Sequence, residues 1–182
     1  MRYFPSSILF FAAGLLWALA SAASVAAQPD DGNSVAQLEK LGARIQRDEH
    51  GKVIALRFGY AKATDATLVN LKGLHNLQRL EMPCVVNVTD TGLANLKELS
   101  ELRFLWIGYS NITDKGLVHL SRLANLEELY VGVYRSHFED AGLIHLRSLK
   151  NLHKLTLART DVSDSAIAAL REALPRCTIQ RK

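Results

Sequence analysis

The residues of this chain that could carry out chemistry are two cysteines and six histidines. His119 and His145 occupy equivalent places in successive copies of a repeated segment and should lie next to each other, but a zinc site normally takes three or four protein ligands. Cys84 could act as a nucleophile with a nearby histidine, although nothing in the sequence would orient such a pair. The chain contains no Gly-rich phosphate loop and no GxSxG, HExxH or CxxC motif. We therefore predict that the protein is not an enzyme and holds no metal and no cofactor.

The two cysteines also raise the question of a disulfide, which is common in exported proteins. Cys84 follows the second strand of the sheet described below, and Cys177 lies in the sixth. Four strand steps of about 4.8 Å separate them by about 19 Å. Because a disulfide requires Cα atoms within about 7 Å, we predict that these two cysteines do not pair.

A series of aspartates recurs once per repeated segment, each after Thr, Ser or Glu. The spacings between them are 25, 24, 26 and 24 residues, and the series is Asp65, Asp90, Asp114, Asp140 and Asp164. A hydroxyl or carboxylate at a helix start accepts the unpaired N–H groups of the first turn, and a negative charge there suits the helix dipole. We interpret the series as helix caps rather than as a metal or acid–base array.

The elements that must position these residues are short helices and strands in alternation. In the segment Thr113–Val131, leucines at every third position from Leu117 mark one face of a helix, and Leu129 and Val131 alternate as on a strand. Further copies of the segment are Thr64–Met82, Thr89–Ile107, Glu139–Leu157 and, more loosely, Ser163–Ile179. Leucine repeats with a period of 20–29 residues indicate an α/β solenoid, with a parallel concave sheet and convex helices.

Between Thr64 and Ile179 the chain resembles the bacterial secreted leucine-rich repeat proteins, which are built on T-D-x-G-L-x-x-L-x-x-L-x-x-L-x-x-L-x-L units. The unit is also similar to the cysteine-containing repeats of F-box-associated proteins. No F-box precedes it here, so a ubiquitin-ligase role does not carry over. The resemblance implies a right-handed leucine-rich repeat solenoid that binds protein through its concave sheet.

The first 27 residues differ in composition from the rest of the chain. Arg2 is followed by an apolar run and then by small residues up to Ala27, the layout of a secretory signal peptide. The alternative is an uncleaved membrane anchor, since Ile8–Ala27 is long enough to span a bilayer. We predict a signal peptide at 1–27 and a linker at 28–34, and therefore a secreted or periplasmic protein.

Both ends of the solenoid are predicted to be closed, because terminal repeats otherwise expose apolar surface. Residues 35–63 form the expected N-terminal cap, with a helix at 35–41 and a β-hairpin at 43–58 whose second strand is also the first strand of the repeat sheet. Residues 64–182 hold the repeats, with a last edge strand within 174–179. Basic residues are scattered and the net charge is only +4, so we expect no nucleic-acid partner.

The concave face is the candidate binding surface. Strand residues between the leucines point to this face, and five of the eight aromatic residues downstream of the leader gather in two adjacent strands. Exposed aromatic residues mark interaction sites. The predicted binding patch consists of Phe104, Trp106, Tyr109, Tyr130, Tyr134, Arg79 and Glu128.

The expected size of the concave sheet limits its partner. About 400 Å² of surface follows from six strands of roughly five residues, half of the roughly 800 Å² that each partner contributes to a standard interface. We predict a non-catalytic module that binds a protein or peptide. The alternatives are a structural or self-associating envelope protein, with the patch as a homodimer interface, and a glycan-binding wall protein.

Overall fold

The computed structural model describes residues 32–60, 62–134 and 138–182. The predicted leader at 1–27 and the first residues of the predicted linker lie outside the described residues. Residues 32–34 of that linker form the first turn of a helix instead, α1 (Gly32–Lys40). Polar Asn33 and Ser34 are compatible with a helix start, and the exact ends of helices are the least certain part of a sequence prediction.

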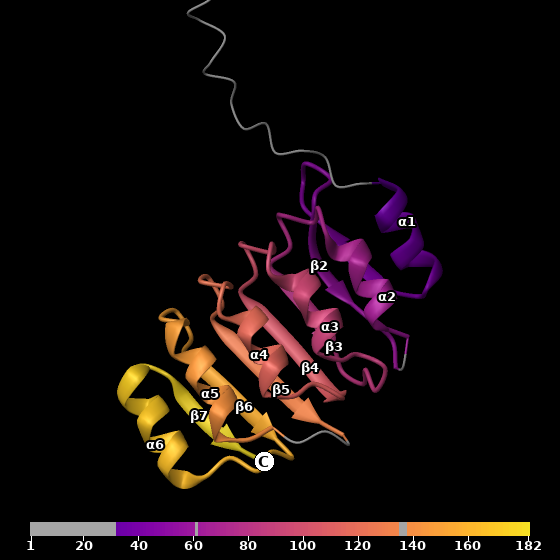
Figure 1. The fold of residues 1–182 in the computed structure, drawn as a ribbon. Coiled ribbons are helices and arrows are strands. Elements are labelled where there is room, and N and C mark those ends of the chain that lie inside the picture. The colour runs from indigo at the N-terminus through magenta and orange to yellow at the C-terminus, as the bar shows by residue number, and fades with distance from the viewer. Residues whose placement is uncertain (1–31, 61, 135–137) are drawn as a thin grey trace, which may run out of the picture.

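One seven-stranded sheet runs the length of the molecule, with its strands in chain order (Figure 1). The first two strands are antiparallel and all later neighbours are parallel. The strands are β1 (Arg44–Arg47), β2 (Val53–Arg57), β3 (Arg79–Met82), β4 (Phe104–Ser110), β5 (Glu128–Val133), β6 (Lys154–Ala158) and β7 (Thr178–Arg181). This arrangement confirms the predicted α/β class.

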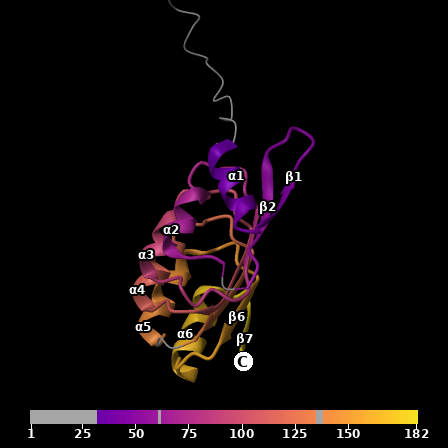
Figure 2. The ribbon, with the colours of Figure 1, turned by 90° about the vertical axis from the view of Figure 1, so that its right-hand side faces the viewer.

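The helices form a second layer on one face of the sheet (Figure 2). After α1 they are α2 (Asp65–Leu68), α3 (Asp90–Leu93), α4 (Asp114–Leu120), α5 (Asp140–Leu143) and α6 (Asp164–Ala173). Three of them continue as 3₁₀ turns, at 69–71, 94–96 and 144–148. Leucines spaced three apart suit the three residues per turn of a 3₁₀-helix, so the helical half of each unit is tighter than one continuous α-helix.

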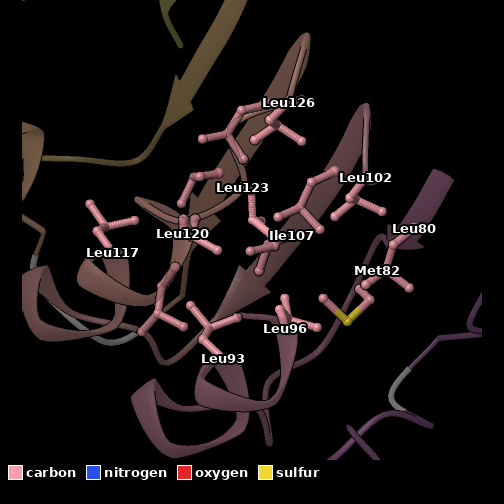
Figure 3. Packing of buried hydrophobic residues seen from close by; sticks show 14 of the residues in the cluster. Leu80, Met82, Leu93, Leu96, Leu102, Ile107, Leu117, Leu120, Leu123 and Leu126 are labelled. Carbon is pink, nitrogen blue, oxygen red and sulfur yellow. The ribbon is translucent and has the colours of Figure 1, made fainter. Parts of the chain in front are cut away.

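The core lies between the two layers and repeats from one unit to the next. Figure 3 shows Leu117 and Leu120 of α4 and Ile107 of β4 between the helical layer and the strands, with Leu123 next to Leu120. All four side chains are buried completely. Each buried leucine contributes on the order of 2 kcal/mol of hydrophobic free energy, so the stacked units stabilise one another through a continuous core.

The recurring aspartate, which follows Thr, Ser or Glu, has a different role from the one predicted for its carboxylate. The threonine hydroxyl does cap its own helix, as when Thr113 Oγ1 accepts from the N–H of Lys115. The carboxylate instead reaches the next unit: Asp90 accepts from the Thr113 N–H and from its hydroxyl, both at 2.7 Å. Equivalent bonds join Asp65 to Thr89, Asp114 to the Glu139 N–H, and Asp140 to Ser163.

These aspartates explain the glycine of each unit. A Cβ atom on Gly116 would overlap the Asp90 carboxylate, and Gly92 and Gly142 stand in the same relation to the aspartates before them. The last unit has Ala166 at the equivalent position. Its cap residue, Ser163, has a backbone φ of −77, whereas Thr113 has a φ of −122. The carboxylate therefore bonds to the next unit, and the glycine leaves the space that this carboxylate occupies.

The C-terminal end differs from the prediction in its boundaries. Helix α6 continues to Ala173, so the last strand begins at Thr178 and Cys177 precedes it instead of lying within it. The reason is a turn at 174–177, closed by the bond from the Cys177 N–H to the Leu174 carbonyl at 2.9 Å. Asp164 has no following unit, and its carboxylate forms an ion pair with Arg181 at 2.9 Å.

Candidate functional site

The open face of the sheet, which points away from the helices, carries the predicted patch. Leu105 and Ile107 of β4 are buried toward the helices, so the alternating Phe104 and Trp106 belong to the open face. The strand register aligns two rows on this face. One row is Arg44, Arg57, Glu81, Trp106, Tyr130, Thr156 and Gln180, and the other is Gln46, Ala55, Arg79, Phe104, Glu128, Lys154 and Thr178.

Trp106 and Tyr130 form the centre of the first row. Their ring centroids lie 5.5 Å apart with an interplanar angle of 62°, an edge-to-face geometry. Both rings lie close to glycines two residues further along their strands. A Cβ on Gly108 would lie 3.1 Å from Trp106 Nε1, and one on Gly132 would lie 3.3 Å from Tyr130 Cε1. The two half-buried rings therefore rest on glycine backbone and are held in place.

The indole N–H of Trp106 is unusual because it is buried and makes no hydrogen bond in the described part of the protein. Buried polar groups without a partner cost about 1–3 kcal/mol. This group is therefore a locally unfavourable feature within the candidate surface.

Arg79 and Phe104 lie beside this pair, in contact with each other. The Arg79 guanidinium carbon stands 3.7 Å from the centre of the Phe104 ring, a cation–π contact. Arg79 Nε also donates to Glu81 Oε1 at 2.6 Å, and Arg57 Nη1 donates to Glu81 Oε2 at 2.7 Å. Glu81 thus fixes two arginines on the open face.

Glu128 lies on the other side of Phe104 in the second row. Its carboxylate accepts from Lys154 Nζ at 3.2 Å and lies 4.0 Å from His153 Nε2. Both partners are more than half exposed, so this ion pair contributes little to stability.

Tyrosines continue from the sheet onto the rim formed by the carboxyl ends of the strands. Tyr109 is 44% and Tyr134 is 46% exposed. Tyr109 lies near the end of β4, which continues to Ser110, and the pairing with β5 shifts register around Tyr109. Tyr109 has φ 50 and Arg159 has φ 58, which is unfavourable for residues with a Cβ. The Arg159 guanidinium carbon lies 5.2 Å from the centre of the Tyr109 ring.

The structure therefore brings the predicted residues together in pairs rather than as one aromatic surface. Trp106 contacts Tyr130, while Phe104 contacts Arg79. Glu128 lies beside Phe104 in the second row, and Tyr109 and Tyr134 lie at the rim. The prediction omitted Arg57, Glu81, Lys154 and Arg159. Glu81, Lys154 and Arg159 contact its members, and Arg57 bonds to Glu81. The same strand alternation that selected the aromatic residues could have found Arg57, Glu81 and Lys154.

The thiols are free and differ in environment. Cys84 is half-buried and Cys177 is buried. Burial raises the pKa of the Cys177 thiol to about 11, so it is neutral and unreactive at physiological pH. Among the described residues, no group of three or more His, Cys, Asp or Glu side chains could hold a metal ion.

Two carboxylates away from the open face have altered acidity. Hydrogen bonds from the Ser163 N–H and then from its hydroxyl lower the pKa of Asp140, and the Lys52 N–H is the largest cause of the lowered pKa of Asp48. In both cases the bonds favour the charged form. Within residues 32–60, 62–134 and 138–182, no helix combines the length and the apolar composition needed to cross a bilayer.

Comparison with known proteins yields similarity in structure only. No family model matches the chain, and no curated protein matches it either. Internalin C2 from Listeria monocytogenes is similar with a TM-score of 0.50 and 25% identity, over 61% of this chain and 44% of that one. The PEPR1-AtPEP1 structure has a TM-score of 0.47 and 18% identity, covering 75% and 19%. Another internalin from Listeria monocytogenes has a TM-score of 0.41 and 19% identity, covering 62% and 36%.

The match to internalin C2 spans less than half of that protein's length. It agrees with the leucines, the strand order and the layer of short helices found in this chain. The chain has a leucine-rich repeat fold.

Proposed function

We propose that this protein is an exported, non-catalytic module that holds a protein or peptide segment on the open face of its sheet, with Trp106 and Tyr130 as the main contacts. The observation that carries the proposal is their edge-to-face pair, partly buried and resting on glycine backbone in the middle of the face. Aromatic side chains that are already ordered lose little conformational entropy on binding. They are also the residues that dominate interface energies.

Several features of the chain support the rest of the proposal. The N-terminal 27 residues have the composition of a signal peptide. The open face is narrow, since its strands are four to seven residues long, and this suits a peptide or loop better than a large flat partner. The predicted rim tyrosines, Tyr109 and Tyr134, would extend the contact beyond the sheet.

The proposal includes a cap at the N-terminal end of the solenoid. Strand β1 pairs with β2 and would protect the edge of the parallel sheet, with α1 over the first unit as the N-terminal cap. The coil is taken as right-handed, as connections between parallel strands almost always are. Removal of residues 32–47 should therefore produce soluble aggregates, which size-exclusion chromatography would detect.

A site-specific crosslinking experiment tests the binding function. A photoreactive benzoylphenylalanine replaces Tyr109 on the rim, and a second protein carries it at Val118 on α4, where the native side chain is 41% exposed. Irradiation of producing cells should give a crosslinked product from position 109 and none from position 118. Adding Trp106→Ala and Tyr130→Ala should remove the product.

Matched controls separate binding from folding. Val118→Ala with Ile144→Ala removes exposed apolar side chains from the helical face and should leave the crosslink at 109 unchanged. Equal crosslinking from both positions, or a product insensitive to the Trp106 and Tyr130 changes, would contradict the proposal. A product of twice the chain's mass would instead identify the patch as a homodimer interface.

A further inference from the structure

The open face is strongly asymmetric in charge. At the end of the sheet that holds β1, Arg57 and Arg79 pair with a single carboxylate, Glu81, and Arg44 lines the same hollow. The formal charge of this group is +2, from three guanidinium groups and one carboxylate. We call these four residues the arginine cluster. It adjoins the aromatic pair, because Glu81 pairs in register with Trp106.

The cluster retains unused hydrogen-bonding capacity. Each of Arg57 and Arg79 uses one nitrogen on Glu81, although a guanidinium has five N–H donors. Both side chains are 49% exposed, whereas the Glu81 side chain is only 10% exposed. Glu81 therefore serves as the buried base of the cluster, and the remaining donors lie on its solvent side.

Arg44 makes the cluster unfavourable in the absence of a ligand. It stands directly opposite Arg57 on the neighbouring antiparallel strand, and like charges in that relation destabilise a sheet. Within the described part of the chain, Arg44 forms no ion pair with a carboxylate. An anion placed between these side chains would remove the repulsion and could accept paired N–H bonds.

The shape of the surface leaves room for such a group. An open hollow at this end of the sheet is lined by Arg44, Gln46, Ala55, Arg57, Arg79 and Glu81. Ala55, which pairs in register with Arg79, has only a methyl side chain and so leaves space beside the long Arg79 side chain. Arg79 is itself held by Glu81 and by the Phe104 ring, so this wall of the hollow is ordered before anything binds.

We propose that the partner is an extended peptide segment that carries acidic side chains in the arginine cluster and an apolar side chain on Trp106 and Tyr130. This proposal rests on the proposed binding function. The distance between the two subsites sets the spacing in the peptide. The distance from Arg57 on β2 to the middle of the aromatic pair on β4 and β5 is two and a half strand steps, about 12 Å. An extended chain advances about 3.3 Å a residue, so the acidic and apolar residues should stand three or four positions apart.

Synthetic peptides test the spacing and the charge. The probe is an acetylated and amidated hexapeptide with two glutamates at one end, a Ser-Gly-Ser spacer and a leucine at the other; its reversed sequence covers the opposite chain direction. Because Trp17 lies in the predicted signal peptide, Trp106 is the single tryptophan of the exported protein. Its fluorescence then reports binding at the patch itself. At least one direction should change this fluorescence saturably, and the affinity should fall several-fold between 50 and 300 mM salt.

Charge variants locate the acidic subsite. Arg44→Gln with Arg57→Gln should weaken binding of the glutamate peptide about tenfold. Arg47→Gln is the matched control, since Arg47 lies on the same strand but pairs with Glu39 at 3.7 Å on the side of α1; it should leave binding unchanged. Arg44→Glu should favour the peptide whose glutamates are replaced by lysines. Thermal midpoints of all variants show whether the fold is intact.

The outcomes separate this inference from the function on which it rests. One outcome is that a peptide with glutamine in place of glutamate binds equally well, and that Trp106→Ala with Tyr130→Ala still abolishes this binding. That result would overturn the acidic subsite but leave the binding function standing. No binding of any glutamate peptide would overturn the inference, and the crosslink at position 109 would then decide the binding function independently. Binding of an acidic oligosaccharide in place of the peptide would overturn the choice of a peptide partner.

Discussion

The two faces of the sheet are built from the same strands, but residues repeat on the buried face and vary on the open face. At the buried register position, Leu80, Leu105, Leu129 and Leu155 are the same residue in four successive strands. One position further along, the open face has Glu81, Trp106, Tyr130 and Thr156. The buried side chains meet the same surroundings in every unit, so one residue type suits all of them. The open positions lie outside this repeated core, so the fold requires no single residue there.

The same contrast appears among the carboxylates. Asp90 and Asp140 each bond to the next unit and recur with the period of the repeat. Glu81 occurs once, between two arginines on the open face. Repetition thus identifies side chains that hold the scaffold, and departure from repetition identifies candidates for binding.

The largest effect is expected from Gly116→Ala. In an ordinary helix this change would stabilise by up to about 1 kcal/mol, but here the added methyl group would overlap the Asp90 carboxylate and approach Leu93 Cδ1 to 3.2 Å. We expect a loss of about 2–3 kcal/mol, typical of overpacking, in the free energy of unfolding by urea. Gly59→Ala, with its nearest neighbour 3.8 Å away, should be close to neutral. A stabilised Gly116→Ala would show that the units are not coupled in this way.

Asp90→Ala should have the next largest effect. It removes the acceptor of two 2.7 Å bonds and leaves the Thr113 N–H without its partner, a loss of about 2 kcal/mol. Asp164→Ala changes the same residue type at the same place in the last unit, where the carboxylate pairs only with exposed Arg181. Chemical denaturation should show almost no effect of that control, and equal losses in the two proteins would argue against inter-unit bonding.

On the open face, Trp106→Ala and Tyr130→Ala should be coupled by about 1 kcal/mol, the usual value for an edge-to-face pair. A double-mutant cycle on the free energy of unfolding measures this coupling. The loss from either single change should remain smaller than the loss from Asp90→Ala, because neither ring is part of the core. A coupling near zero would mean that the rings do not hold each other in solution.

The smallest effect concerns the acid dependence of stability. Because the pKa of Asp140 is lowered in the folded protein, its contribution is fully present above the ordinary pKa of 3.8 and is lost as the pH falls through the lowered value. The difference in thermal midpoint between the wild type and Asp140→Asn should therefore be present at neutral pH and disappear in acid. Ser163→Ala removes only the hydroxyl bond, so it should shift this acid dependence without abolishing it. A difference that does not vary with pH would contradict the assignment.

Much of the architecture was predictable because it depends on local periodicity. Leucines three apart, as at Leu117 and Leu120, indicated helical turns, and alternation around Tyr130 indicated strands. Counting along each strand also placed Trp106 beside Tyr130, and the register agrees. Whether these residues bind a partner stays a prediction that the experiments above would test.

Other features depend on contacts between residues that are far apart in the sequence. The sequence determined which residues face the helices and which face solvent, because alternation needs only neighbouring residues. Only the stacking of units decided that Asp90 bonds to Thr113 of the next unit and that Gly116 must lack a side chain to admit it. Likewise, the shift of register at Tyr109 and the joining of Arg57 and Arg79 through Glu81 arise from the spacing of adjacent strands. Such distances are set in three dimensions, by packing across units about 24 residues apart.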